Sequence, residues 1–255
     1  MILEDTKQKY IDKLGPKFGQ MFHDVKEEWG YILYRYQEFM VLFGESEKRL
    51  ALLNALSPGF THGLQIDMSE ALILGLCRLT DTDNRSVSVC HLPKFIRDKP
   101  NLKDEVECHV LRARSHACTA RIRRNKWIAH RDKARTKTTV TYKDIKDGLD
   151  TVHAALNAIT MDYCNQALMN EVISQKMSTA RFIGGLESLI EGAMYIESCI
   201  DPDGESDPLN EKVSEAFVRK IGGDPSKDQV KIQDLRMVAQ TIKRELDEEF
   251  YNLKA

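Results

Sequence analysis

The stretch Ala71–Cys77, which reads ALILGLC, contains no polar side chain. A helix of this composition is apolar on nearly every side, so other elements have to surround it. Proline is rare in the chain, and no run alternates apolar and polar residues as a half-buried strand would. The sequence therefore predicts an all-α fold, a helical bundle with residues 60–79 as its central helix.

Further helices are predicted from apolar residues spaced three and four apart. Residues 18–43 are rich in aromatic residues, with Gly44 as a stop and Ser46 as the restart for a shorter helix. A long helix is expected from about residue 103, and another over residues 141–170 that opens on a capping box. We expect an up-and-down helical bundle over residues 1–170.

The last third of the chain is predicted to be a C-terminal helical extension. Residues 171–255 contain further amphipathic stretches, separated by an acidic, turn-rich linker at 201–207 and a glycine-rich loop at 222–225. The sequence leaves open whether this extension packs on the same core as residues 1–170.

Composition indicates a soluble, core-forming protein of the cytoplasm. The 255 residues are 42% hydrophobic and 30% charged, with a formal net charge of −2. The first ten residues are charged where a signal peptide would be apolar, and no window has the apolar length of a membrane span. The six cysteines form no C-x-x-C pair, which is typical of reduced, packed thiols.

Arg124 lies at a helix position where a charge is unusual. It continues a stripe of apolar residues spaced three and four apart, which marks one face of the helix. A charge on such a face is unusual because a guanidinium is costly to bury without a partner. The stripe consists of Val106, Val110, Ala113, Ala117 and Ala120 before Arg124, and Ile128 after it. The sequence therefore places Arg124 against the protein interior or a partner.

Arg124 also lies in the most basic run of the chain. Residues 112–137 contain ten basic residues and one acid, Asp132. Such a run usually forms a solvated surface, but the scarcity of acids favours a polyanion such as RNA. The residues we predict to contact RNA are Arg121, Arg123, Lys126, Arg131, Lys133 and Arg135.

Arg124 and His130 are sufficient, in principle, for RNA cleavage without a metal. A histidine can take or give a proton near neutral pH, and an arginine stabilises the charge that develops on a phosphate. Asn125 could orient either group. Six residues of ideal helix leave the two side chains about 120° apart. They converge only if the helix ends or distorts before His130, or if two chains share one cleft.

The segment Arg124-Asn125-x-x-x-x-His130 resembles the signature of the HEPN superfamily, an arginine and a polar residue followed by a histidine. The string RNKWIAHRD, the upstream LILGLCRLTD and the aromatic first helix with Trp29 are similar to the AbiU-type abortive-infection branch. The resemblance covers roughly residues 15–165. It does not extend to the region after about residue 170.

The resemblance implies a HEPN-like helical-bundle homodimer whose motifs face each other across the interface. It implies a metal-independent endoribonuclease that leaves a 2′,3′-cyclic phosphate and acts in phage defence or a toxin–antitoxin system. Arg124 and His130 would be the catalytic pair and Asn125 an auxiliary residue. A non-catalytic module that binds RNA, a nucleotide or a partner protein is the alternative, and a purely structural dimer in a defence complex is a third.

Two other groups of residues receive structural interpretations. Arg78 and Asp81 are predicted to form an ion pair inside the bundle. Two histidines and two cysteines precede Arg124 on the helix expected from about residue 103. They do not have the spacing of a four-ligand zinc site, so neither a metal nor a cofactor is expected. These residues are Cys108, His109, His116 and Cys118.

Overall fold

The computed structural model describes residues 2–44, 46–129 and 139–169, together with 179, 182–185 and 188. Every regular element in these ranges is helical, which confirms the predicted all-α fold. Two π-helices and two 3₁₀ turns are interspersed among the α-helices. The elements are α1 (Ile2–Leu14), α2 (Pro16–Phe39), η1 (Met40–Gly44), α3 (Glu47–Leu56), α4 (Pro58–Leu79), η2 (Val89–His91), η3 (Pro93–Phe95), α5 (Pro100–Arg123), η4 (Arg124–Ala129) and α6 (Tyr142–Cys164).

The chain divides into two compact units. The first contains Met1–Met40 and Leu64–Lys176, and the second contains Val41–Gly63 and Met177–Ala255. The candidate site lies in the first unit. Most of the predicted C-terminal extension lies outside the described residues, so the boundary expected at residue 170 stays a prediction.

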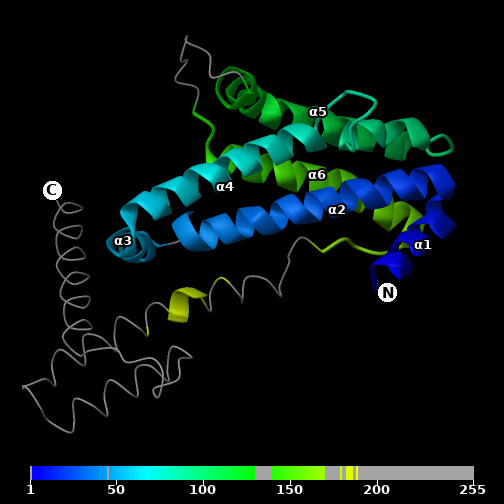
Figure 1. The fold of residues 1–255 in the computed structure, drawn as a ribbon. Helices are drawn as coiled ribbons and strands as arrows, with labels where there is room; N and C mark the ends of the chain where they lie inside the picture. Colours follow the sequence, from blue (N-terminus) through cyan, green and yellow to red (C-terminus); the bar gives the residue numbers. More distant parts are fainter. Residues whose placement is uncertain are drawn as a thin grey trace, which may run out of the picture. The chain divides into compact units, whose positions relative to one another are not determined.

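The long helices of the first unit alternate in direction along the chain, as an up-and-down bundle requires (Figure 1). Most of the apolar run on α4 lies in the core, with Leu72, Leu76 and Cys77 at most 1% exposed. Leu74 is 36% exposed, so the helix is not covered on every side as its composition predicts. Neighbouring helices approach α4 closely at glycines. A Cβ added to Gly75 would lie 2.8 Å from Ile32 of α2, and one added to Gly148 of α6 would lie 2.8 Å from Leu76.

Helices α5 and α6 bury the faces that the sequence predicts. On α5 the buried residues include the predicted stripe from Val106 to Ala120. The capping box that opens α6 is present, since Thr141 accepts from Asp144 N and donates its own N–H to the Asp144 carboxylate. That helix ends sooner than predicted, because Asn165 adopts a left-handed conformation (φ 50°) and terminates it.

Helix α1 was not predicted, and it packs against the start of α2. Gly15 joins the two helices with φ 86°, a conformation that glycine adopts without strain. Pro16 then begins α2 at a position where its missing N–H is not needed. Gly19 allows the helices to touch, because a Cβ at this position would lie 2.5 Å from the backbone oxygen of Tyr10.

No helix in the part of the chain that the structure describes combines the length and apolar character needed to cross a bilayer.

Two glycines on α2 are expected to respond oppositely to alanine. Gly19→Ala places a methyl group against backbone and should destabilise the fold by about 1–3 kcal/mol. Gly30→Ala meets no atom within 4 Å and should stabilise it by about 0.5–1 kcal/mol through helix propensity. Urea unfolding followed by circular dichroism measures both. Equal effects of the two variants would contradict the close α1–α2 contact.

Candidate functional site

The side chain of Arg124 lies half-buried at the point where α5 ends. It follows the fully buried Ala117 and Ala120 on the same stripe. Its Nε donates a hydrogen bond of 2.9 Å to Oδ1 of Asn125, which is exposed. Asn125 is thus in position to orient the guanidinium.

The helix changes from α to π geometry at Arg124 and continues so to Ala129. A distortion before His130 is one of the alternatives that the sequence leaves open for the convergence of Arg124 and His130. Wide turns of this kind occur often at functional sites. His130 itself lies outside the described residues, as do Arg131, Lys133 and Arg135. Convergence of Arg124 and His130 therefore stays a prediction.

Three further basic residues of the predicted RNA surface lie beside Arg124. Lys126 is exposed and Arg123 is half-buried. The guanidinium of Arg121 donates to the backbone oxygen and the hydroxyl of Thr80, at 2.6 and 2.7 Å. This contact was not predicted. The sequence shows Thr80 only as part of the string that ends the central helix.

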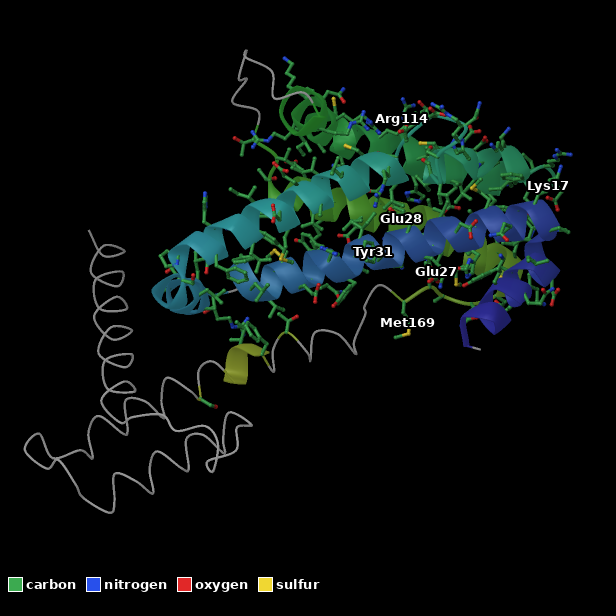
Figure 2. The ribbon with its side chains drawn as sticks, in the orientation of Figure 1. Lys17, Glu27, Glu28, Tyr31, Arg114 and Met169 are labelled. Carbon is green, nitrogen blue, oxygen red and sulfur yellow. The ribbon has the colours of Figure 1, made fainter. Side chains whose placement is uncertain are left out.

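The predicted pair of Arg78 and Asp81 is wrong. Arg78 forms an ion pair of 2.6 Å with Glu28 of α2, and its side chain is 60% exposed instead of lying inside the bundle. Figure 2 labels Glu28 on α2. Asp81 follows the end of α4, and its carboxylate accepts from the backbone N–H of Asp83. The direction of α4 points Arg78 toward α2, whereas the turn carries Asp81 away.

The charges of Arg124 and Arg121 reach a buried thiol on α4. Burial raises the pKa of Cys77 above its usual value, and the two guanidinium groups partly oppose that rise. Cys77 lies three residues before Thr80, so the ends of α4 and α5 come together here. The candidate site therefore lies where the C-terminal ends of α4 and α5 meet. One side of it faces solvent, and the other side is buried.

The cysteines and histidines of α5 show no sign of a metal site. Cys108 and Cys118 are exposed, and the His109 ring lies 3.9 Å from Glu105. Within the described ranges, no three or more His, Cys, Asp or Glu side chains are grouped so as to hold a metal ion.

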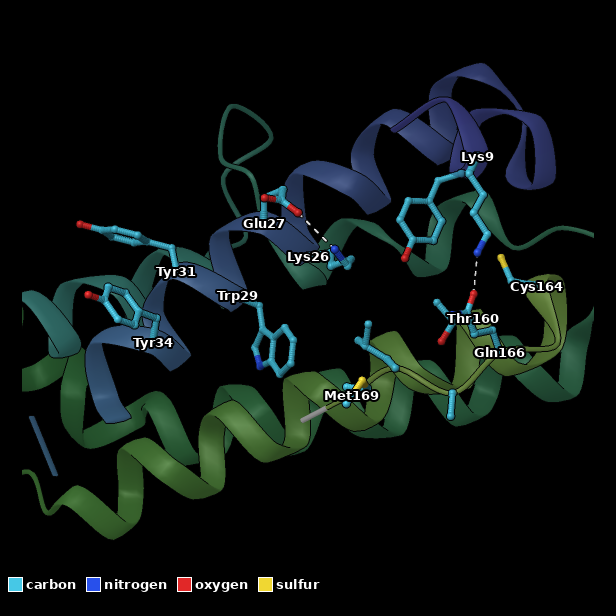
Figure 3. A pocket seen from close by; sticks show the side chains of 14 residues that line it. Lys9, Lys26, Glu27, Trp29, Tyr31, Tyr34, Thr160, Cys164, Gln166 and Met169 are labelled. Atoms are coloured by element: carbon cyan, nitrogen blue, oxygen red, sulfur yellow. Dashed lines mark hydrogen bonds and ion pairs between the residues drawn. The ribbon is translucent and has the colours of Figure 1, made fainter. Parts of the chain in front are cut away.

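A separate cavity of about 700 Å³ lies between α1, α2 and α6 (Figure 3). Trp29, Tyr31 and Tyr34 line it together with Lys9 and Lys26. Its polar groups are largely paired already, which leaves little to select a ligand: Lys9 with Gln166, Lys26 with Glu27, Trp29 Nε1 with Leu149 O, and Tyr34 with Glu38. No residue of α5 or η4 contributes to this cavity.

A helical bundle with an arginine–asparagine pair at the distorted end of a long helix has the architecture of a HEPN domain. Comparison with protein families agrees. The chain matches the model of the HEPN family described as AbiU2 over residues 15–175, and it therefore belongs to that family. The match begins at the start of α2 and runs past the end of α6, so it includes the whole of the Arg124 region.

Searches among curated proteins and among solved structures gave no match.

The packing around Cys77 predicts a pattern of cysteine reactivity. Iodoacetamide should modify the exposed Cys108 and Cys118 of the native protein and leave Cys77 unmodified. Because burial raises the pKa of Cys77, bringing the pH from 7 to 8.5 should leave this thiol protonated and unreactive. Peptide mass spectrometry measures each site. Rapid labelling of Cys77 without unfolding would contradict the packing of α4 beside Arg121 and Arg124.

Proposed function

We propose that the protein is a metal-independent endoribonuclease whose catalytic pair is Arg124 and His130. The observation that carries the proposal is the half-buried guanidinium of Arg124, held by Asn125 where α5 changes to a π-helix. Membership in the HEPN AbiU2 family supports it. His130 is the next residue after η4, so the distorted turn leads directly to the proposed acid–base group.

In the proposed mechanism His130 takes a proton from a ribose 2′-hydroxyl, which attacks the adjacent phosphorus. The bond to the 5′-oxygen breaks, and this oxygen takes a proton from solvent water as it leaves. The products are a 2′,3′-cyclic phosphate and a 5′-hydroxyl. Arg124 stabilises the negative charge that builds on the phosphate oxygens. Because Asn125 accepts from Nε, the two Nη groups are the ones that bind the phosphate in this arrangement.

Electrostatic attraction supplies the affinity for RNA in this proposal. Lys126 is exposed beside the Arg124–Asn125 pair, and Arg123 adds a second cation on the same turn. Arg131, Lys133 and Arg135 continue the basic run beyond the described residues. Few acids interrupt this run, so phosphate groups on either side of the scissile bond would meet cations.

A second copy of the chain is the proposed partner of α5. The outer face of this helix, opposite its buried stripe, carries two exposed apolar side chains, Leu111 (63% exposed) and Ile122 (40% exposed). The exposed Cys108 and Cys118 lie on the same face. These residues recur at steps of three, seven and four, so they form one stripe that leads toward Asn125. An apolar stripe on the motif helix supports a homodimer that covers this face. An antitoxin or another defence protein would be a further partner.

Cleavage of RNA in EDTA tests the proposed activity. The wild type should cut mixed RNAs and leave 2′,3′-cyclic phosphate ends. His130→Ala should lower the rate about 10²–10⁴-fold because the proton carrier is lost. Arg124→Ala should lower it about 10²–10³-fold because the phosphate charge is no longer stabilised.

His62→Ala is the matched control, since His62 is an exposed histidine on α4 with no proposed role, and it should cleave at the wild-type rate. Persistent cleavage by His130→Ala would refute the mechanism. A wild type that binds RNA but never cleaves it would instead favour the non-catalytic module.

The outer stripe of α5 predicts the state of association. Ile122→Glu and Leu111→Glu place a charge on this stripe and should convert a dimer into monomers at micromolar concentration. Met161→Glu alters an apolar side chain of similar exposure on α6 and should leave the dimer intact. Sedimentation velocity measures all three. If the wild type sediments as a monomer, the dimer proposal fails while the cleavage assay remains decisive for the activity.

A further inference from the structure

The guanidinium of Arg121 is held entirely by oxygen atoms of the protein. Its Nη2 donates to the backbone oxygen of Thr80 at 2.6 Å and to the Thr80 hydroxyl at 2.7 Å. Its Nη1 donates to the backbone oxygen of Arg114 at 3.0 Å, about two turns back along α5. Figure 2 labels Arg114 on this helix. Arg121 is half-buried and Thr80 is fully buried. Both hydrogens of Nη2 are used, so a forked contact with a phosphate through Nη2 would require this side chain to give up its bonds to Thr80.

Thr80 offers a favourable site for a cation. It directly follows α4, where the last backbone carbonyls lack helical partners and the helix dipole is negative. The Thr80 hydroxyl donates to Leu76 O at 2.7 Å, so its lone pairs remain to accept from Arg121. Arg121 thus caps the C-terminal end of α4 with charge-assisted hydrogen bonds, which are stronger than neutral ones.

The cap lies directly before the change of helix type. Arg121 is in the last turn of α5, and the π-helix begins three residues later at Arg124. The backbone N–H of Arg124 is shared between the carbonyls of Ala120 and Arg121, so the last α-helical bonds of α5 end at the residue where the π-helix begins. The bond to Thr80 therefore fixes the final regular turn from which the π segment starts.

We propose that Arg121, anchored on Thr80, is a positioning residue that sets the start of the π-helix and the direction of the Arg124 guanidinium. Its role in catalysis rests on the proposed ribonuclease function. It does not contact RNA, although its place in the basic run predicts such a contact. Arg121 and Arg124 are arginines of the same basic run, but their hydrogen-bond partners differ. These partners distinguish the positioning role of Arg121 from the proposed catalytic role of Arg124.

Substitutions that break the bonds between Arg121 and Thr80 but keep the positive charge distinguish a positioning role from a phosphate contact. Arg121→Lys retains a cation for a phosphate but cannot form the forked bond to Thr80. Thr80→Val removes the hydroxyl and keeps the shape. Both should lower kcat about 10- to 100-fold through misplacement of Arg124, and leave the KM for RNA at its wild-type value. Thr80→Ser keeps the hydroxyl and should restore the rate.

The salt dependence of RNA binding supplies the second readout. Arg121→Ala should leave the slope of log K against log salt unchanged, because no phosphate contact is lost. Lys126→Ala, the matched loss of a proposed phosphate contact, should reduce that slope by about 1. A slope that falls by about 1 in Arg121→Ala, with kcat unchanged, would overturn the positioning role.

Hydrogen exchange tests the anchor without any activity. The amides of residues 124–129 should exchange at least tenfold faster in Arg121→Ala and Thr80→Val than in the wild type, and Lys126→Ala should leave them unchanged. Thermal unfolding checks that each variant is folded. If an anchor variant does not fold, the exchange is measured on Arg121→Lys instead. Wild-type exchange in the anchor variants would overturn the inference. If no RNA is cleaved, the proposed function fails, and exchange still decides the positioning role.

Discussion

The close contact of α4 with α2 and α6 is the constraint on which the rest of the bundle depends. An all-round apolar helix can be buried only if its neighbours approach on several sides, and Gly75 and Gly148 allow that approach. The position of α4 in turn fixes where its C-terminal end lies, and with it the buried Thr80 that receives Arg121. The candidate site therefore depends on core packing about one turn back along α4, as well as on its own residues.

Periodicity predicted most of the first unit because burial dictates it. The buried stripe of α5, the capping box at Thr141 and the stop at Gly44 all follow from local rules that need no knowledge of neighbours. The Arg78 pairing was wrong for the opposite reason, since an ion pair depends on which helix lies opposite, here α2 with Glu28. A distorted helix was one of several alternatives that the sequence left open, and the start of the π-helix at Arg124 could not be located from sequence. The anchor that sets it is a contact between helices.

The candidate site was partly predictable for the same reason. Arg124 attracted notice because a charge interrupts an apolar stripe, and the structure places it half-buried beside Asn125. Charge alone could not separate Arg124 from Arg121, since both lie in one basic run. Their partners separate them: an exposed amide for one, a buried helix end for the other. The proposed contact with phosphate and the joint between two helix ends thus use the same residue type within a single turn.

The π-helix at the end of α5 also makes the chain tolerant of changes in length. In a regular α-helix one inserted residue rotates every later side chain by about 100°. A wide turn absorbs an extra residue locally, so the buried alanines before it keep their register. The spacer between Arg124 and His130 can thus gain or lose a residue without disturbing the core of the bundle. Related sequences could shift the histidine around the arginine by altering the length of this π segment alone, which would change the geometry of the proposed site while the scaffold stays constant.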